Sequence, residues 1–290
     1  GIVAKDGLDG LVISTILAGI FLILMGLCHF GSLIKFIPYT ITTGFTSGIA
    51  VTIVIGQLKD FFGVTYPNGL KPIETMEKLN AFALGFSSFH VDALIVGGVS
   101  LAILIISPYI FKRIPGSLIA VVIGILMVKF LPLHVSTIGN LYTITNDLPS
   151  FHIPAVKFSM VKSAIPNAFT IAVLAAIESL LSCVVADGMI NGKHRSDMEL
   201  VAQGAGNIAS ALFGGIPATG AIARTAANIK NGGRTPVAGM VHSITLVIVL
   251  VVLMPFAGMI PMPTIAAILF IVAYNMCQCC LLYTSPSPRD

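Results

Sequence analysis

The sequence predicts an all-α integral membrane protein, and both its composition and its long apolar stretches support this fold class. Hydrophobic residues make up 56% of the 290 positions and charged residues only 10%, whereas soluble domains carry about 25% charge. The mean hydropathy is +0.97. Apolar stretches close to the roughly 20 residues that a bilayer-crossing helix needs recur along the whole chain. We therefore expect the chain to lie in a lipid bilayer.

Eight apolar stretches are predicted to cross or enter the membrane. The first five are long and carry at most one formally charged residue each, so each is predicted to form a plain crossing helix. The sixth is short, and the last two carry no formal charge. In chain order the stretches are Leu8–Phe30, Tyr39–Leu58, Ala93–Phe111, Gly116–Leu133, Ile165–Ala186, Leu200–Phe213, Val237–Met254 and Met259–Met276.

The segment after the sixth stretch departs from a plain helical hairpin. Leu200–Phe213 is followed by Gly214-Gly215-Ile216-Pro217 and then by the still shorter stretch Ala218–Lys230. We interpret this as a short helix, a break, and a half-helix. A backbone can break at membrane depth only where protein or a water-filled cavity satisfies its hydrogen bonds. Such interrupted segments indicate the binding site of a membrane transporter.

The N-terminal end of this half-helix is predicted to attract an anion. We place that end around Thr219–Ile222, near the bilayer midplane. The first N–H groups of a helix have no partner within it, and the helix dipole adds positive potential there. Arg224 lies one turn further on and adds a full positive charge to the same place. An arginine in an apolar segment is by default a functional residue.

Glu178 is the second ionisable residue deep in a predicted span. Two roles follow from its position. A buried carboxyl group can take up a proton at cellular pH, which would couple transport to protons. Alternatively, Glu178 and Ser182, one turn away, could coordinate Na⁺. The competing structural hypothesis is a buried ion pair with Arg224, although such a pair is a costly way to hold helices together.

The remaining polar residues are assigned no chemistry. The loop from Asp187 to Glu199 mixes acids and bases and is interpreted as a solvated surface. Ser243 and His242 cannot form a nucleophile–base pair, because adjacent helical residues point about 100° apart. We therefore do not expect an enzyme. The cysteines near the C-terminus lack a second ligand pair, so no metal or other cofactor is predicted.

Basic residues in short loops predict the orientation of the chain, because such loops face the cytoplasm. The two long connections, Lys59–Asp92 and Leu133–Ser163, have roughly balanced charges and are predicted to lie outside. The short basic loops predicted to be cytoplasmic contain Lys35, Lys112 and Arg113, Lys193 and Arg195, and Lys230 and Arg234.

Three stretches carry a resemblance to a known family. They read "AAIESLLSCVVADGM", "HRSDMELVAQGAGNIASALFGGIPATGAIARTAANIKNGGRTPVAGMVHS" and "AILFIVAYNM". They resemble the SulP (sulfate permease) family of anion transporters. That family includes bacterial carriers of dicarboxylates, sulfate and bicarbonate, and animal anion exchangers. The resemblance runs from about Gly10 to Met276.

The resemblance implies an architecture as well as a location. Family members have a transport domain of fourteen segments in two inverted seven-segment repeats (7+7). These form a core domain and a gate domain, and the core slides against the gate like an elevator. On this map residues 1–276 are a partial transport domain, from about the fourth to the twelfth segment. Residues 277–290 are expected to be a non-native tail, and the family's STAS domain is expected to be absent. A homodimer in the inner (plasma) membrane is implied.

The resemblance also implies which residues bind the anion. In the family, substrate lies between the N-terminal ends of the third and tenth segments, and the half-helix corresponds to the tenth. Arg224 falls at the family's basic position. After Thr219, the residues expected to present backbone to the anion are Gly220, Ala221, Ile222 and Ala223.

For coupling, the resemblance favours protons over Na⁺. Glu178 falls at the acidic position of the eighth segment, which is Asp in Na⁺-coupled bicarbonate carriers. Ser182 falls where those carriers have Thr, and Ile222 supplies no side-chain oxygen. We expect no cofactor beyond the coupling ion.

The predicted function is therefore secondary active transport of a small inorganic or organic anion of the sulfate, dicarboxylate or bicarbonate class, coupled to protons. Two alternatives stay open: a Na⁺-coupled bicarbonate transporter, and a nucleobase permease of the same architecture, which would not need Arg224. The lipid bilayer is the expected environment. A net charge of +4 without a basic stripe and interleaved aromatic residues argues against a nucleic-acid partner.

Overall fold

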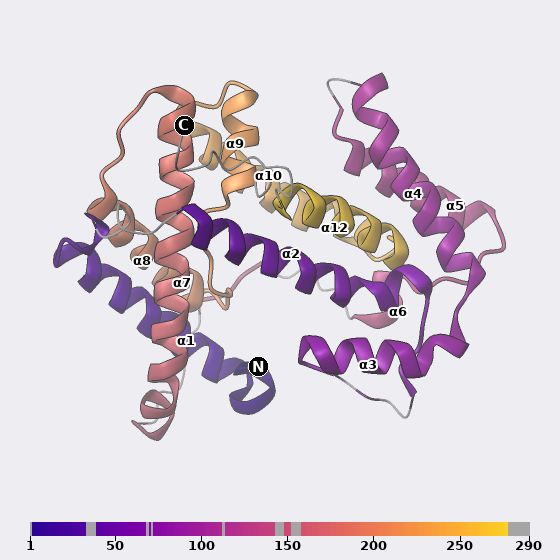
Figure 1. The fold of residues 1–290 in the computed structure, drawn as a ribbon, viewed down its shortest axis with the longest axis horizontal. Coiled ribbons are helices and arrows are strands. Elements are labelled where there is room, and N and C mark those ends of the chain that lie inside the picture. The colour runs from indigo at the N-terminus through magenta and orange to yellow at the C-terminus, as the bar shows by residue number, and fades with distance from the viewer. Residues whose placement is uncertain are drawn as a thin grey trace, which may run out of the picture. The chain divides into compact units, whose positions relative to one another are not determined.

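The computed structural model of the protein describes residues 2–32, 39–67, 70, 72–111, 114–142, 148–151 and 158–277. In these ranges the regular elements are helices (Figure 1), apart from an isolated antiparallel bridge between Thr137 and Pro261. The predicted all-α fold class is confirmed. Of the predicted tail 277–290, all but Cys277 lies outside the described residues.

The chain divides into two compact units, each built from two separate stretches of sequence. Unit 1 comprises Gly1–Pro38 and Asp147–Leu246, and unit 2 comprises Tyr39–Asn146 and Val247–Asp290. The last boundary falls inside a helix, α10 (Val237–Ile248).

Unit 1 contains the interrupted segment from Leu200 to Lys230, in which the sequence predicts the binding site. Its helices are α1 (Ile2–Leu27), α7 (Phe158–Ile190), α8 (Ser196–Leu212) and α9 (Ile222–Lys230), followed by most of α10. Helix α1 packs against α7 and α8, and α9 packs against α7. The core of this unit is made largely of small residues: Ala18, Leu22, Ala168, Ala172, Ala175, Ala176, Leu180 and Leu200.

Small residues let α1 and α8 approach closely. A Cβ atom at Gly19 would lie 2.7 Å from the backbone oxygen of Gly204, and one at Gly204 would lie 2.5 Å from the backbone oxygen of Gly19. No larger residue fits at this crossing without moving a helix. Helix association in lipid depends on such close packing. This pair of glycines therefore sets how closely α1 and α8 pack, and the positions of α7 and α9 follow from that packing.

Unit 2 contains the remaining helices. Helix α12 packs against α2 and α4 around a core that includes Phe61, Leu104 and Ala120, and a buried hydrogen bond of 2.9 Å joins Ser100 Oγ to Thr264 Oγ1. The helices of unit 2 are α2 (Tyr39–Phe62), α3 (Thr75–Gly85), the 3₁₀ turn η3 (Phe86–Ser88), α4 (Val91–Ile110), α5 (Gly116–Phe130), α6 (Ile138–Leu141), the π-helical η4 (Val249–Leu253), α11 (Met254–Ala257) and α12 (Met262–Cys277).

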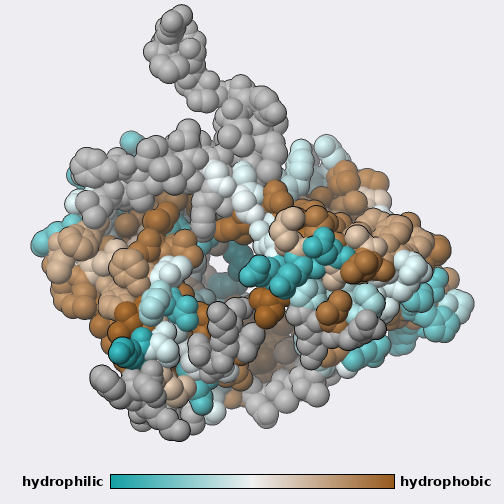
Figure 2. Space-filling view, turned by 60° about the horizontal axis from the view of Figure 1, so that its bottom comes forward, coloured by the Kyte–Doolittle hydropathy of each residue, from teal (hydrophilic) through white to brown (hydrophobic). Residues whose placement is uncertain are grey.

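The described helices suit a bilayer by length and by surface. Three are long and apolar enough to cross a membrane, namely Gly7–Leu27, Val91–Ile110 and Met160–Ile190. Shorter apolar helices cover Gly116–Phe130, Val237–Leu253 and Met262–Met276. Large apolar side chains are exposed on helices of both units, and Figure 2 shows apolar residues over much of the face in view.

The structure adds detail to the sequence prediction in two elements. The long connection Lys59–Asp92 contains α3, whose first turn is closed by a capping box between Glu74 and Glu77. The half-helix α9 begins at Ile222, at the C-terminal limit of the range Thr219–Ile222 in which its N-terminal end is predicted.

Candidate functional site

The break between α8 and α9 is built from glycines and a serine. Gly214 adopts a φ of +73°, a left-handed conformation that favours glycine. The backbone N–H of Gly215 donates to Ser210 O at 2.7 Å, and Ser210 Oγ donates to Ile216 O at 3.1 Å. The chain thus leaves α8 in a defined turn and runs on without helical structure to Ala221.

The extended segment is attached to α7 just before α9 begins. Thr219 Oγ1 donates to Ala175 O at 3.0 Å. Gly220 lies against Ser179, since a Cβ atom at Gly220 would lie 3.2 Å from Ser179 Cα. A side chain at Gly220 would push the α7 backbone away by a few tenths of an ångström, so glycine allows the closest approach of this segment to α7.

Helix α9 begins without a side-chain cap. Its N-cap is Ala221, with φ −120° and ψ 111°, and no side chain accepts a hydrogen bond there. Ser, Thr, Asp and Asn are the usual residues at this position because they accept the first free N–H groups. The N–H groups of the first turn, Ile222–Arg224, therefore keep their capacity to bind another acceptor.

The predicted anion-site residues accordingly fall into two groups. Thr219, Gly220 and Ala221 lie in the extended segment, and residues 222–224 form the first turn of α9. The side chain of Ala223 lies outside what the structure describes. Arg224 is exposed.

Glu178 and Ser182 lie on successive turns of α7, and Ser182 contacts α9 through a hydrogen bond that the sequence does not reveal. Ser182 Oγ and Thr225 Oγ1 share a hydrogen bond of 2.7 Å. Glu178 is half-buried, and the structure records no ion pair between it and Arg224, although it describes both residues. The competing hypothesis of an ion pair between them gains no support.

Contrary to the prediction, the segment Asp187–Glu199 is not a solvated surface throughout. Its last residue, Glu199, lies in the first turn of α8 and contacts α7. Ser179 Oγ donates to Glu199 Oε1, so this carboxylate contacts the residue next to Glu178. Elsewhere in the loop, His194 Nδ1 lies 2.7 Å from Asp187 Oδ2. The contact to Glu199 was missed because the partners lie on different helices. The only sequence signal is that Glu199 directly precedes an apolar stretch.

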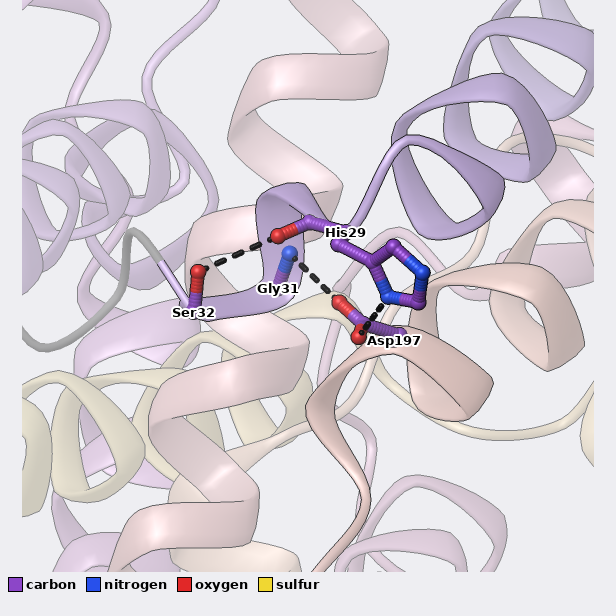
Figure 3. Close-up of polar contacts among 4 residues, drawn as sticks. All are labelled: His29, Gly31, Ser32 and Asp197. Carbon is purple, nitrogen blue, oxygen red and sulfur yellow. Dashed lines mark hydrogen bonds and ion pairs between the residues drawn. The ribbon is translucent and has the colours of Figure 1, made fainter.

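A second contact joins the end of α1 to the start of α8 (Figure 3). The carboxylate of Asp197 accepts the backbone N–H of Gly31 at 3.0 Å and lies 2.8 Å from His29 Nδ1. A Cβ atom at Gly31 would lie 2.6 Å from Asp197 Oδ1, so the turn after α1 fits closely over the first turn of α8. Ser32 Oγ closes the turn by donating to His29 O at 3.1 Å. This contact fixes the end of α8 that carries Glu199.

Comparison with protein-family models decides the relationship. The model described as the sulfate permease family matches residues 3–281. The chain belongs to the sulfate permease family. The resemblance read from the sequence motifs is thereby confirmed.

Several members of the family are similar over nearly the whole chain. The putative sulfate transporter YvdB of Bacillus subtilis is 41% identical over 284 residues, covering 96% of this chain and 52% of that protein. The bicarbonate transporter BicA of Synechocystis is 32% identical over 281 residues, covering 95% of this chain and 49% of that protein. The chain thus spans about half the length of these relatives.

Solved structures agree with this assignment. The transmembrane domain of a cyanobacterial bicarbonate transporter BicA matches with a TM-score of 0.84 at 31% identity, over 98% of this chain and 73% of that one. The anion transporter Slc26a9 of the mouse matches with a TM-score of 0.81 at 20% identity, over 97% of this chain and 47% of that one, and supports the fold alone.

Family membership establishes the class and location of the protein. Sulfate permease family members are integral membrane proteins, and the similar proteins named above are transporters and not enzymes. The chain is accordingly a membrane protein of a transporter family, and its bacterial relatives place it in the plasma membrane. The alternative assignment to the nucleobase permeases is not supported by the family match.

Proposed function

We propose that the protein is a secondary active transporter of small anions of the sulfate, bicarbonate and dicarboxylate class, and that it binds them at the N-terminus of α9. The observation that carries the proposal is the non-helical break before α9, which leads into a helix start without a side-chain cap and with Arg224 in its first turn. Helix α9 begins at Ala221, which offers no oxygen to its first N–H groups. In a membrane protein, free N–H groups at a helix start form a site for an anion.

The local charge supports the same proposal. The dipole of α9 places partial positive charge at Ile222–Arg224, and Arg224 adds a full charge within the same turn. Thr219 and Gly220 hold the chain that leads into this turn against α7. A small anion would accept backbone N–H bonds at 220–223 and a charge-assisted bond from Arg224.

For coupling we propose proton uptake by carboxyl groups beside this site. Glu178 directly precedes Ser179 in sequence, and Ser179 Oγ donates to Glu199 Oε1. A carboxyl group that takes up a proton on one side of a membrane and releases it on the other couples anion movement to the proton gradient. The hydroxyl of Ser182, which a Na⁺ site would need, is already shared with Thr225. Na⁺ coupling is therefore the second candidate.

The mechanism we propose is the elevator movement implied by family membership. In it, unit 1 corresponds to the core domain and unit 2 to the gate domain of a 7+7 inverted repeat. The division of the chain into two compact units supports this assignment. We further propose a homodimer as the assembled state.

The test is uptake by the product of the complete gene in proteoliposomes. Labelled sulfate, bicarbonate and fumarate are offered with an imposed proton gradient, and then with a Na⁺ gradient at equal pH. The same assay is run on Glu178→Gln and Glu199→Gln, which keep side-chain size and remove the titrating group. Ser243→Ala serves as the control, because among the described residues Ser243 Oγ donates only to Gly239 O of its own helix, at 3.0 Å.

Uptake driven by the proton gradient, and reduced at least about ten-fold in one or both Gln variants, is the expected result. It would also name the substrate. Uptake driven by Na⁺ alone would replace proton coupling by the second candidate. Failure of the wild type to take up any of the three anions under either gradient would contradict the proposed function.

A further inference from the structure

We propose that Asn207 is a positioning residue for the anion site: its side-chain amide clamps the backbone of Ala218 and thereby sets where α9 begins. This inference rests on the proposed function for its consequence in transport, but the clamp itself is a feature of the fold. Asn207 lies in the C-terminal half of α8 and is 1% exposed.

The amide of Asn207 makes paired hydrogen bonds with one residue. The backbone N–H of Ala218 donates to Asn207 Oδ1 at 2.9 Å, and Asn207 Nδ2 donates back to Ala218 O at 2.9 Å. This reproduces the pairing of two peptide groups across an antiparallel bridge. The remaining N–H of Asn207 donates to Gln203 O at 2.9 Å. All of the amide's donors are used, as a buried polar group requires.

Gln203, one turn earlier on α8, adds to the clamp, because its Nε2 also donates to Ala218 O. Ala218 is thus the point at which the extended segment is tied to α8, while Thr219 is tied to α7 through Ala175 O. The two consecutive residues are bound to two different helices. Ala221, the N-cap of α9, follows three residues after Ala218, so little freedom is left for the first turn of α9.

The chemistry explains why asparagine stands at this position. The clamp needs an acceptor and a donor side by side, in the spacing of a peptide group, on a side chain short enough to stay buried. Ser and Thr have a single oxygen, Leu has neither group, and Gln is longer by a methylene. Because a non-helical backbone in a membrane protein needs partners for its N–H and C=O groups, the break before α9 depends on this side chain.

The test compares substitutions of Asn207 in the complete protein. Asn207→Leu keeps the number and branching of the side-chain heavy atoms and removes both bonds to Ala218 as well as the bond to Gln203 O. Asn207→Asp keeps the acceptor, and when protonated it regains an O–H donor toward Ala218 O. The matched control is Asn231→Ala, which removes an exposed amide at the end of α9 whose bond goes to Ala227 O at 2.8 Å.

Two measurements are made on each variant. Hydrogen exchange of the 213–221 backbone, in detergent and without substrate, reports on the clamp directly. The KM and maximal rate of uptake report on its consequence, and the uptake of Asn207→Asp is measured across pH as a ratio to the wild type. Taking this ratio cancels the effect that titration of Glu199 and Glu178 has on uptake, because the variant and the wild type both contain these residues.

We expect Asn207→Leu to speed exchange in 213–221 by about ten-fold or more while α1 stays protected, and to raise KM by about ten-fold with a smaller change in maximal rate. The ratio for Asn207→Asp should rise as pH falls, and Asn231→Ala should match the wild type.

Unchanged exchange in Asn207→Leu would overturn the clamp. Faster exchange with unchanged KM would overturn its role in positioning the site. If the wild type takes up no anion, the proposed function fails, but the exchange result still decides whether the clamp exists.

Discussion

At the scale of single residues, Arg224 is the most direct test of the anion site. It is exposed and lies in the first turn of α9, where the helix dipole is also positive. We expect Arg224→Ala to raise the KM for anion uptake by about ten-fold, since one charge-assisted hydrogen bond is lost. The KM of Arg224→Lys should lie between that of the wild type and that of Arg224→Ala, because lysine keeps the charge but not the planar donor geometry. Uptake kinetics over a range of anion concentrations measure this.

The control for Arg224 is Arg234→Ala, an exposed arginine in the loop after α9. It changes the net charge equally but leaves the first turn of α9 intact. If both substitutions raised KM alike, the effect would come from the general field of the protein and not from a site at α9.

Sequence alone singles out a residue only where that residue is unusual for its surroundings. Glu178 and Arg224 stand out from sequence alone because a charge in an apolar segment is costly. Asn207 and Ser179 do not stand out, because they carry no charge and their roles depend on partners reached by folding. Asn207 meets Ala218 only because the chain turns back at Gly214. The roles assigned to Glu178, Ser182 and residues 219–224 stay predictions.

At the scale of elements, the crossing of α1 and α8 is predicted to tolerate no added methyl group. Gly204→Ala would place a Cβ atom 2.5 Å from Gly19 O, and overpacking of this kind costs about 1–3 kcal/mol. We expect a fall of several degrees in the melting temperature of the purified protein, measured in detergent by loss of the monodisperse chromatographic peak.

Gly206, two residues further on in α8, provides the matched control. A Cβ atom there would meet no atom within 4 Å, and alanine is the better helix former by up to about 1 kcal/mol. Gly206→Ala should therefore leave the melting temperature unchanged or raise it. Equal destabilisation by both substitutions would show that the loss of glycine flexibility, and not the helix crossing, is responsible.

The helices themselves were largely readable from apolar stretches, because length and hydropathy decide which segments can cross a bilayer. The residues at which the helices begin and end were less readable from the sequence. The start of α9 is predicted around Thr219–Ile222 and lies at the far end of that range, because Ala218 to Ala221 are held extended by hydrogen bonds from Asn207 and to Ala175. Those bonds are tertiary and override local helix propensity. Helix α3 was missed because its sequence, TMEKLNAFALG, is only weakly apolar and lies in a connection.

At the scale of the whole molecule, the two units could not be predicted from composition or periodicity. Each is assembled from two stretches of sequence, and unit 2 interrupts unit 1 between Pro38 and Asp147. Apolar stretches of both units look alike because both face lipid. The family resemblance supplied the idea of a core and a gate domain, and contacts such as that between His29 and Asp197 tie the distant parts of unit 1 together.

The orientation of the chain in the membrane gives the last prediction. The loops with Lys193 and Arg234 are expected in the cytoplasm, because short basic loops stay on that side. The connections with Asn80 and Ser136 are expected outside. Single cysteines at these four exposed positions, in a protein whose five native cysteines are replaced by alanine, are treated with a membrane-impermeant maleimide in intact cells. Asn80→Cys and Ser136→Cys should be labelled at once, and Lys193→Cys and Arg234→Cys only after permeabilisation. The opposite pattern would invert the topology, and with it the side of the membrane on which the contact between Asp197 and His29 lies.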